Sequence, residues 1–227
     1  MWKTIVALGR SSHPGPTVAV TAIALILGLG VGLEPWRLLV VGLMFLTNQL
    51  SVGLSNDWID AARDRAVGRT DKPIAAGLVS VTVARNTAFV CAGLAIALSL
   101  LLGWPAAIAQ FVFLASGWTY NLGLKRTVFS IAPYIVGFAT VPSVVTLSLP
   151  TPAFAALWVT VMGGVFGAVA HFANALPDLD DDRATGVRGL PQRIMTGRGS
   201  RVVFRLIIAG ALATVLVLAL TGAPLLA

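Results

Sequence analysis

Seven apolar segments, each close to the length of a membrane-spanning helix, constrain this chain more than any other feature. They cover roughly residues 15–33, 37–55, 82–102, 105–122, 128–149, 153–175 and 202–222, and about 20 apolar residues suffice for an α-helix to cross a bilayer. Of 227 residues, 57% are hydrophobic and 11% are charged, and the mean hydropathy is +0.88. The sequence therefore predicts an all-α, multi-pass transmembrane helical bundle of about seven spans. No cleavable leader pattern precedes the first span, so we expect that span to be retained.

The distribution of basic residues predicts the orientation of this bundle. With a cytoplasmic N-terminus, alternation of the spans places fifteen of the sixteen Lys and Arg residues on the inner side and leaves only Arg37 outside. This distribution follows the positive-inside rule. The net charge of +7 then reflects inner loops and an anionic ligand, and argues against nucleic-acid binding. We expect an integral membrane protein of a prokaryotic inner membrane, with its polar loops in the cytoplasm.

A polar pattern occurs twice, at the inner ends of the second and sixth spans. Asn56, Asp60 and Asp64 form the first copy, and the second copy follows 118 residues later as Asn174, Asp178 and Asp182. The copies also align at Arg65/Arg183, Ala66/Ala184, Gly68/Gly186 and Pro73/Pro191. Residues four apart drift by only about 40° around a helix, so each copy places its oxygen atoms on one face. Two such faces suit Mg²⁺ ions that bridge carboxylates to a phosphorylated ligand.

An alternative is that these are ordinary solvated loops, in which Arg63, Arg65 and Arg183 pair with neighbouring acids. A single acidic loop would favour that interpretation. Two copies in register favour metal, because facing acidic clusters beside hydrocarbon repel one another unless cations lie between them.

The repeat also predicts the organisation of the chain. Both copies end spans of the same direction, four helices apart, so the repeats are parallel and their unit is four helices. We interpret 1–227 as one domain, with a first repeat at about 1–122 and a second at about 123–227. The second repeat is incomplete, since a full unit would need an eighth span.

Further polar residues occur at or within the spans. Tyr120 lies at the inner end of the fourth span and is followed by Lys125 and Arg126. Such residues commonly form an aromatic belt and a topogenic stop, but a tyrosine can also stabilise a developing cation, and Lys and Arg can hold a phosphate leaving group. His171 is expected to be a packing residue rather than a catalytic one. Asn48 and Gln49 are expected to form interhelical hydrogen bonds, with contact to an acceptor as the lesser alternative.

Taken together, these motifs resemble those of the UbiA superfamily of intramembrane prenyltransferases. The resemblance covers the whole chain in order: Asn56-Asp57-x-x-Asp60-x-x-x-Asp64, Arg69, Lys72-Pro73, Gly77, Tyr120, Lys125-Arg126, and Asn174 to Asp178-x-x-x-Asp182. It implies a helical bundle whose cavity opens sideways to lipid. It further implies two Mg²⁺ ions bound by Asn56, Asp60, Asp64, Asp178 and Asp182, with Asn174 added from the repeat. The catalytic residues it implies are Asp60, Asp64, Asp178, Asp182 and Tyr120, and the residues it implies for the donor diphosphate are Arg65, Arg69, Lys72, Lys125 and Arg126.

The activity implied by the resemblance is transfer of a prenyl group from a polyprenyl diphosphate donor to a small lipophilic acceptor, aromatic or hydroxyl-bearing, within membrane lipid. Lys72 stands where family members commonly have Arg. The family typically has nine helices, so we expect this chain to lack the last two, which a protein partner could supply. Three alternatives remain: a terpene cyclase that ionises the same donors, a transporter or receptor for an anionic lipid, and a non-catalytic protein that binds prenyl lipids.

Overall fold

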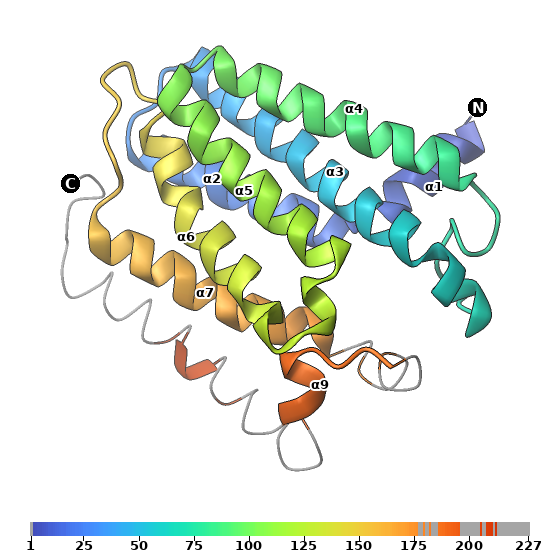
Figure 1. Cartoon of the computed structure of the whole chain (residues 1–227). Helices are drawn as coiled ribbons and strands as arrows, with labels where there is room; N and C mark the ends of the chain where they lie inside the picture. The colour runs from blue at the N-terminus through green and yellow to red at the C-terminus, as the bar shows by residue number, and fades with distance from the viewer. Residues whose placement is uncertain are drawn as a thin grey trace.

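The described part of the chain folds into a bundle of helices (Figure 1). The computed structural model describes residues 2–176, 179, 182, 186–195, 205, 208–210 and 212. Its helices are α1 (Trp2–Ser11), α2 (Pro14–Gly30), α3 (Pro35–Ala66), α4 (Val81–Leu100), α5 (Trp104–Leu122), η1 (Leu124–Arg126), η2 (Val128–Ile131), α6 (Ala132–Thr146), α7 (Leu157–Ala175) and α9 (Leu190–Ile194). The predicted all-α class is confirmed.

The helices α2 to α7 lie over the first six predicted spans, whereas only a few residues of the seventh, 202–222, are among those described. Within the described residues, four segments are long and apolar enough to cross a membrane: Pro35–Ala66, Val81–Leu100, Val128–Thr146 and Leu157–Ala175. A fifth span results if α1 and α2, which meet at a bend of 70°, count as one. The short helix α1 and this bend were not predicted.

Local sequence explains where several helices begin. Proline stands in the first turn of α2, α3, α5 and α6, where its fixed φ suits a helix and its missing N–H is not needed. The α4 helix has a side-chain cap instead, because Ser80 Oγ accepts a hydrogen bond from Val83 N at 3.2 Å. Both devices satisfy or remove donors that have no intrahelical partner.

The long helix α3 organises the bundle. It packs against α2, α4 and α5, while α6 packs between α5 and α7. Phe45 of α3 and Phe113 of α5 have ring centroids 5.3 Å apart, and both belong to the larger hydrophobic cluster. The C-terminal ends of α3 and α7, which carry Asn56 and Asn174, reach the same cavity. The fold therefore brings the first residues of the two predicted motifs to the same cavity.

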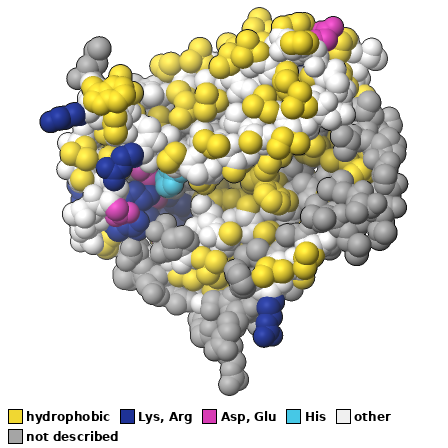
Figure 2. Space-filling model, turned by 180° about the vertical axis from the view of Figure 1, so that it is seen from behind, with side chains coloured by type: hydrophobic (Ala, Val, Ile, Leu, Met, Phe, Trp, Pro, Cys, Tyr) yellow, Lys and Arg dark blue, Asp and Glu magenta, His cyan; other side chains and the backbone are white. Residues whose placement is uncertain are grey.

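The outer surface of the bundle is apolar over most of its length. Figure 2 shows hydrophobic side chains spread over one face, with most of the charged side chains gathered at the left of the view. Large exposed hydrophobic residues include Ile26, Leu29, Phe89, Phe111 and Leu157. Exposed apolar side chains on this scale are costly in water but suit helices surrounded by lipid.

Candidate functional site

The first predicted motif lies on one face at the C-terminal end of α3. Asn56, Asp60 and Asp64 occupy three consecutive turns and all line one small polar cavity of about 50 Å³. Asp60 and Asp64 are only 2% and 3% exposed. Carboxylates this buried require compensating positive charge.

The second motif reaches the same cavity. Asn174 and Asp182 line it, although they are more than 100 residues from the first motif in sequence. Gln192 Nε2 donates a hydrogen bond to Asp182 Oδ2 at 2.8 Å and thereby ties α9 to this motif. Asp178, the remaining predicted ligand, lies outside the described residues.

Two cations of the protein lie among these carboxylates. Lys125 Nζ donates to Asp60 Oδ2 at 2.5 Å and to Asn56 Oδ1 at 3.0 Å. Burial lowers the pKa of the Lys125 ammonium, although the Asp60 carboxylate opposes that change. Arg63 Nη2 lies 3.2 Å from Asp60 Oδ2 and 3.4 Å from Asp64 Oδ1. Both cations therefore reach the same oxygen atom of Asp60.

The remaining oxygen atoms of the first motif are suited to a metal ion. Asp60 Oδ1 and Asp64 Oδ2 are buried and accept no hydrogen bond within the described part of the chain. A buried carboxylate oxygen without a donor is costly, and Mg²⁺ prefers oxygen ligands of this kind. The described residues alone contain no group of three or more His, Cys, Asp or Glu side chains that could hold a metal ion. The site thus fits Mg²⁺ through Asp60 and Asp64, with Asn56 and Asn174 as neighbouring oxygen donors.

Of the other residues predicted to bind the diphosphate, some line the polar cavity and some do not. Lys72 and Arg69 line the polar cavity together with Lys125. Arg65 and Arg126 are exposed and are not among its lining residues. Arg65 instead donates from Nη2 to Ile74 O at 3.2 Å. The structure therefore gathers three of the five predicted basic residues at the site.

Two of the gathered residues also have acidic partners. Lys72 Nζ donates to Asp57 Oδ1 at 2.7 Å, and His13 Nε2 lies 2.9 Å from the same oxygen atom. Arg69 pairs with the exposed Asp71, and its hydrogen bonds lower the pKa of that carboxyl to about 2. These contacts fix the positions of Lys72 and Arg69 in the lining of the cavity.

The two motifs end in the same backbone turn. Gly68 has φ of 73° and Gly186 has φ of 77°, a left-handed conformation that side-chain-bearing residues adopt at a cost. Each turn is closed by a hydrogen bond across six residues, from Arg69 N to Asp64 O at 2.9 Å and from Val187 N to Asp182 O at 2.8 Å. The glycines that align in sequence thus have equivalent roles in the structure.

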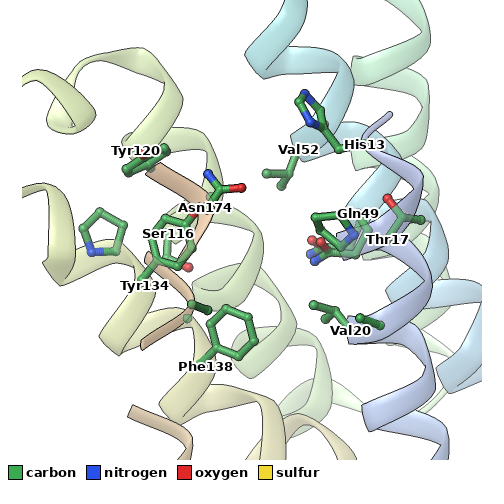
Figure 3. Close-up of a pocket in the computed structure, with 18 of the residues that line it drawn as sticks. His13, Thr17, Val20, Gln49, Val52, Ser116, Tyr120, Tyr134, Phe138 and Asn174 are labelled. Carbon is green, nitrogen blue, oxygen red and sulfur yellow. The ribbon is translucent and has the colours of Figure 1, made fainter. Parts of the chain in front are cut away.

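A larger apolar cavity of about 650 Å³ adjoins the polar one (Figure 3). It is lined by residues of the α1–α2 bend and of α2, α3, α5, α6 and α7. Asn56, Tyr120 and Asn174 line both cavities. The Tyr120 ring lies edge-on to the rings of Tyr134 and His171, at centroid distances of 5.1 and 5.7 Å. The predicted catalytic tyrosine therefore stands where the polar and apolar cavities meet.

Two residues of the site were not selected as site residues from the sequence. Arg63 was considered only as a partner of neighbouring acids in the alternative without metal, yet it contacts both motifs, since its Nη1 lies 3.5 Å from Asp182 Oδ1. His13 lines the apolar cavity and contacts Asp57 from 44 positions away. A signal for Arg63 was present, because it lies three residues after Asp60 and so on the same helix face. His13 had no such signal.

The fold and this site define a class of membrane protein that joins a carboxylate-lined polar cavity to an apolar one. Residues 17–227 match the UbiA prenyltransferase family, and the chain belongs to that family. It is accordingly an integral membrane protein. The resemblance stated from the motifs is confirmed.

Individual relatives are also similar to this chain. A digeranylgeranylglyceryl phosphate synthase from Korarchaeum cryptofilum is 33% identical over 176 residues, which cover 74% of this chain and 60% of that protein. The chain thus spans less than two thirds of this curated relative's length. A structure of a UbiA homologue from Archaeoglobus fulgidus bound to GPP and Mg²⁺ has a TM-score of 0.71 at 16% identity, covering 91% of this chain and 75% of that one. The same homologue bound to DMAPP and Mg²⁺ has a TM-score of 0.70 at 17% identity, covering 93% and 76%. At such identities these structures establish the fold.

Proposed function

We propose that this protein is a Mg²⁺-dependent intramembrane prenyltransferase, which ionises a polyprenyl diphosphate and transfers the prenyl group to an aromatic or hydroxyl-bearing acceptor. One observation carries the proposal. A buried polar cavity lined by carboxylates and basic residues opens, at Asn56, Tyr120 and Asn174, into an apolar cavity of about 650 Å³. A molecule with an anionic head and a long hydrocarbon tail matches this pair of cavities.

The polar cavity would hold the diphosphate. Mg²⁺, bound by Asp60 and Asp64 with Asn56, Asn174, Asp178 and Asp182 as further ligands, would neutralise the diphosphate as its charge grows. Lys125, Lys72 and Arg69 would donate hydrogen bonds to the leaving oxygen atoms. We further propose two Mg²⁺ ions, one associated with each motif.

The apolar cavity would hold the isoprenoid tail and exclude water. The allylic C–O bond breaks with both electrons passing to the diphosphate, and a carbocation is left beside Tyr120, whose ring face can stabilise it. The acceptor then forms the new bond to the cation and releases a proton. Tyr120 lies where the two cavities meet, which is where this bond would break.

The relatives support a particular first choice of substrates. The similar structures hold GPP or DMAPP with Mg²⁺, and the curated relative is named for a digeranylgeranylglyceryl phosphate product. We therefore propose prenyl diphosphates as donors and a hydroxyl of a glyceryl phosphate lipid as the first acceptor to test. We also propose a prokaryotic inner membrane as the location, with the motif loops in the cytoplasm and two parallel four-helix repeats.

The test is Mg²⁺-dependent release of diphosphate from radiolabelled geranylgeranyl diphosphate by the purified full chain. Asp60→Asn and Asp182→Asn should each abolish release, while Glu34→Gln, at the opposite end of α3, should not. Glu34 is a fit control because its carboxylate pairs with Arg37 and does not line either cavity. The labelled product distinguishes transfer from cyclisation. Release that is independent of metal and of both aspartates would refute the proposal.

A further inference from the structure

The apolar cavity has two walls of different chemistry. Phe113, Tyr134, Phe138 and Phe166 contribute aromatic rings from α5, α6 and α7. The α3 helix contributes two neighbouring amides to the lining, Asn48 and Gln49. Figure 3 shows Gln49 beside Thr17 on one side of the cavity, with Tyr134 and Phe138 on the other.

Asn48 is the unusual member of this lining. Its side chain is 0% exposed, and neither Nδ2 nor Oδ1 has a hydrogen-bond partner within the described residues. An amide buried without partners is costly, and the cost is greater in a low-dielectric interior. A polar group of a ligand that reached this amide would supply the hydrogen-bond partner that it lacks.

Three other polar side chains of the cavity already have partners. Thr17 Oγ1 donates to Ser12 O at 2.8 Å, and Ser116 Oγ donates to Phe113 O at 2.7 Å. Asn121 Nδ2 donates to Val52 O at 2.9 Å and to Ser55 Oγ at 2.7 Å. Asn48 therefore differs from them in being buried beside the cavity with both amide atoms uncommitted.

The ligand group that meets these amides must be uncharged. Among the described residues no Asp, Glu, Lys or Arg lines the cavity, and the imidazole of His13 is occupied by its contact with Asp57. A charged group buried there would lack a counter-ion. An amide offers one acceptor and two donor hydrogens, so it matches a hydroxyl or a carbonyl group.

We propose that Asn48 and Gln49 form a subsite that binds an uncharged hydroxyl or carbonyl group of the acceptor, while the donor's isoprenoid tail lies against the aromatic wall. The assignment of the ligand as the acceptor rests on the proposed function. Asn48 precedes Asn56 by eight residues, or about 12 Å along α3. The subsite therefore holds a part of the acceptor remote from the bond that forms, and it selects and orients that molecule.

The experiment uses two probes of similar size that differ by a hydroxyl group, 2-naphthol and 2-methylnaphthalene. Their dissociation constants are measured by calorimetry on the full chain in nanodiscs, with Mg²⁺ and farnesyl thiodiphosphate present to fill the donor site. Empty nanodiscs give the blank. Wild-type protein should bind 2-naphthol about tenfold more tightly, the value of one or two well-placed hydrogen bonds. The Asn48→Leu, Gln49→Leu double variant should reduce this ratio to about one.

The matched control is Gln110→Leu. Gln110 is also 0% exposed and has both amide atoms without a partner in the described chain, but it does not line the cavity. Its replacement should leave the tenfold ratio unchanged, and thermal unfolding verifies that each variant is folded. A wild-type ratio near one, an unchanged ratio in the double variant, or an equal loss in Gln110→Leu would overturn the proposal. Binding needs no turnover, so an intact ratio in a protein that releases no diphosphate would refute the proposed reaction and still support the subsite.

Discussion

Arg63 Nη1 lies 3.5 Å from Asp182 Oδ1, so a single guanidinium links the two acidic motifs. The same side chain contacts Asp60 and Asp64 of its own motif through Nη2. Arg63 is about three-quarters buried, with a side-chain exposure of 23%. Three carboxylates thus share one cation, which reduces their mutual repulsion in the absence of metal.

Replacing Arg63 by Gln should have opposite effects on stability and on metal binding. Without the guanidinium, the three carboxylates repel one another, so the metal-free protein should lose about 1–3 kcal/mol of stability. The same repulsion should raise the affinity for Mg²⁺ or Mn²⁺. Thermal unfolding with EDTA and Mn²⁺ titration measure the two effects. Arg126→Gln is the control, because Arg126 is exposed and lies outside the cavity lining. Weaker Mn²⁺ binding in Arg63→Gln would contradict this account.

Lys125 should matter for the reaction more than its neighbour Arg126. Its ammonium is 7% exposed and bonds to Asp60 and Asn56. Loss of one preorganised donor to a leaving group costs about 100-fold or more in kcat, which we expect for Lys125→Met. Arg126→Met should change kcat by less than about threefold, as for an exposed charge. Diphosphate release under saturating donor measures both. Equal losses would instead place Arg126 in the site, as the sequence predicted.

The local part of the site could be predicted from the sequence because helical spacing fixes it. Asn56, Asp60 and Asp64 are four residues apart, and any uninterrupted helix places them on one face. The structure has that helix, α3, and continues it to Ala66. Gly68 and Gly186, which align in the sequence, both have positive φ in the structure.

The long-range contacts could not be predicted in this way. The contact of His13 with Asp57 depends on the bend between α1 and α2, and no periodicity in the sequence specifies that bend. Asn48 was expected to bond to another helix, but the structure leaves its amide beside the cavity without a partner in the described chain. Both features result from how the helices pack, which hydrophobic spacing alone does not determine.

The paired glycine turns predict matched losses of stability. An added Cβ at Gly68 or Gly186 meets no atom of the described residues within 4 Å, so we attribute the cost of Gly68→Ala or Gly186→Ala to the left-handed backbone. That cost is about 1–2 kcal/mol. Gly93→Ala is the control, since Gly93 has equally open surroundings but lies inside α4, where alanine is favoured over glycine by up to about 1 kcal/mol. Thermal unfolding should show a loss of stability for Gly68→Ala and for Gly186→Ala, and no loss for Gly93→Ala. Similar shifts in all three would contradict the role of positive φ.

Gly53 should tolerate no side chain, because α3 there touches the bend that carries His13. An added Cβ would lie 2.3 Å from Ser12 O, a backbone atom. Relief of that overlap requires α3 and the bend to separate, and such overpacking costs about 1–3 kcal/mol or more. The contact between His13 and Asp57 should be lost as well. Gly42→Ala is the control, because its Cβ would meet only the flexible end of Leu25, at 3.0 Å. The unfolding temperature and the rate of diphosphate release should both decrease for Gly53→Ala and change little for Gly42→Ala. Equal effects of the two substitutions would show that the bend is not held against α3 as the structure has it.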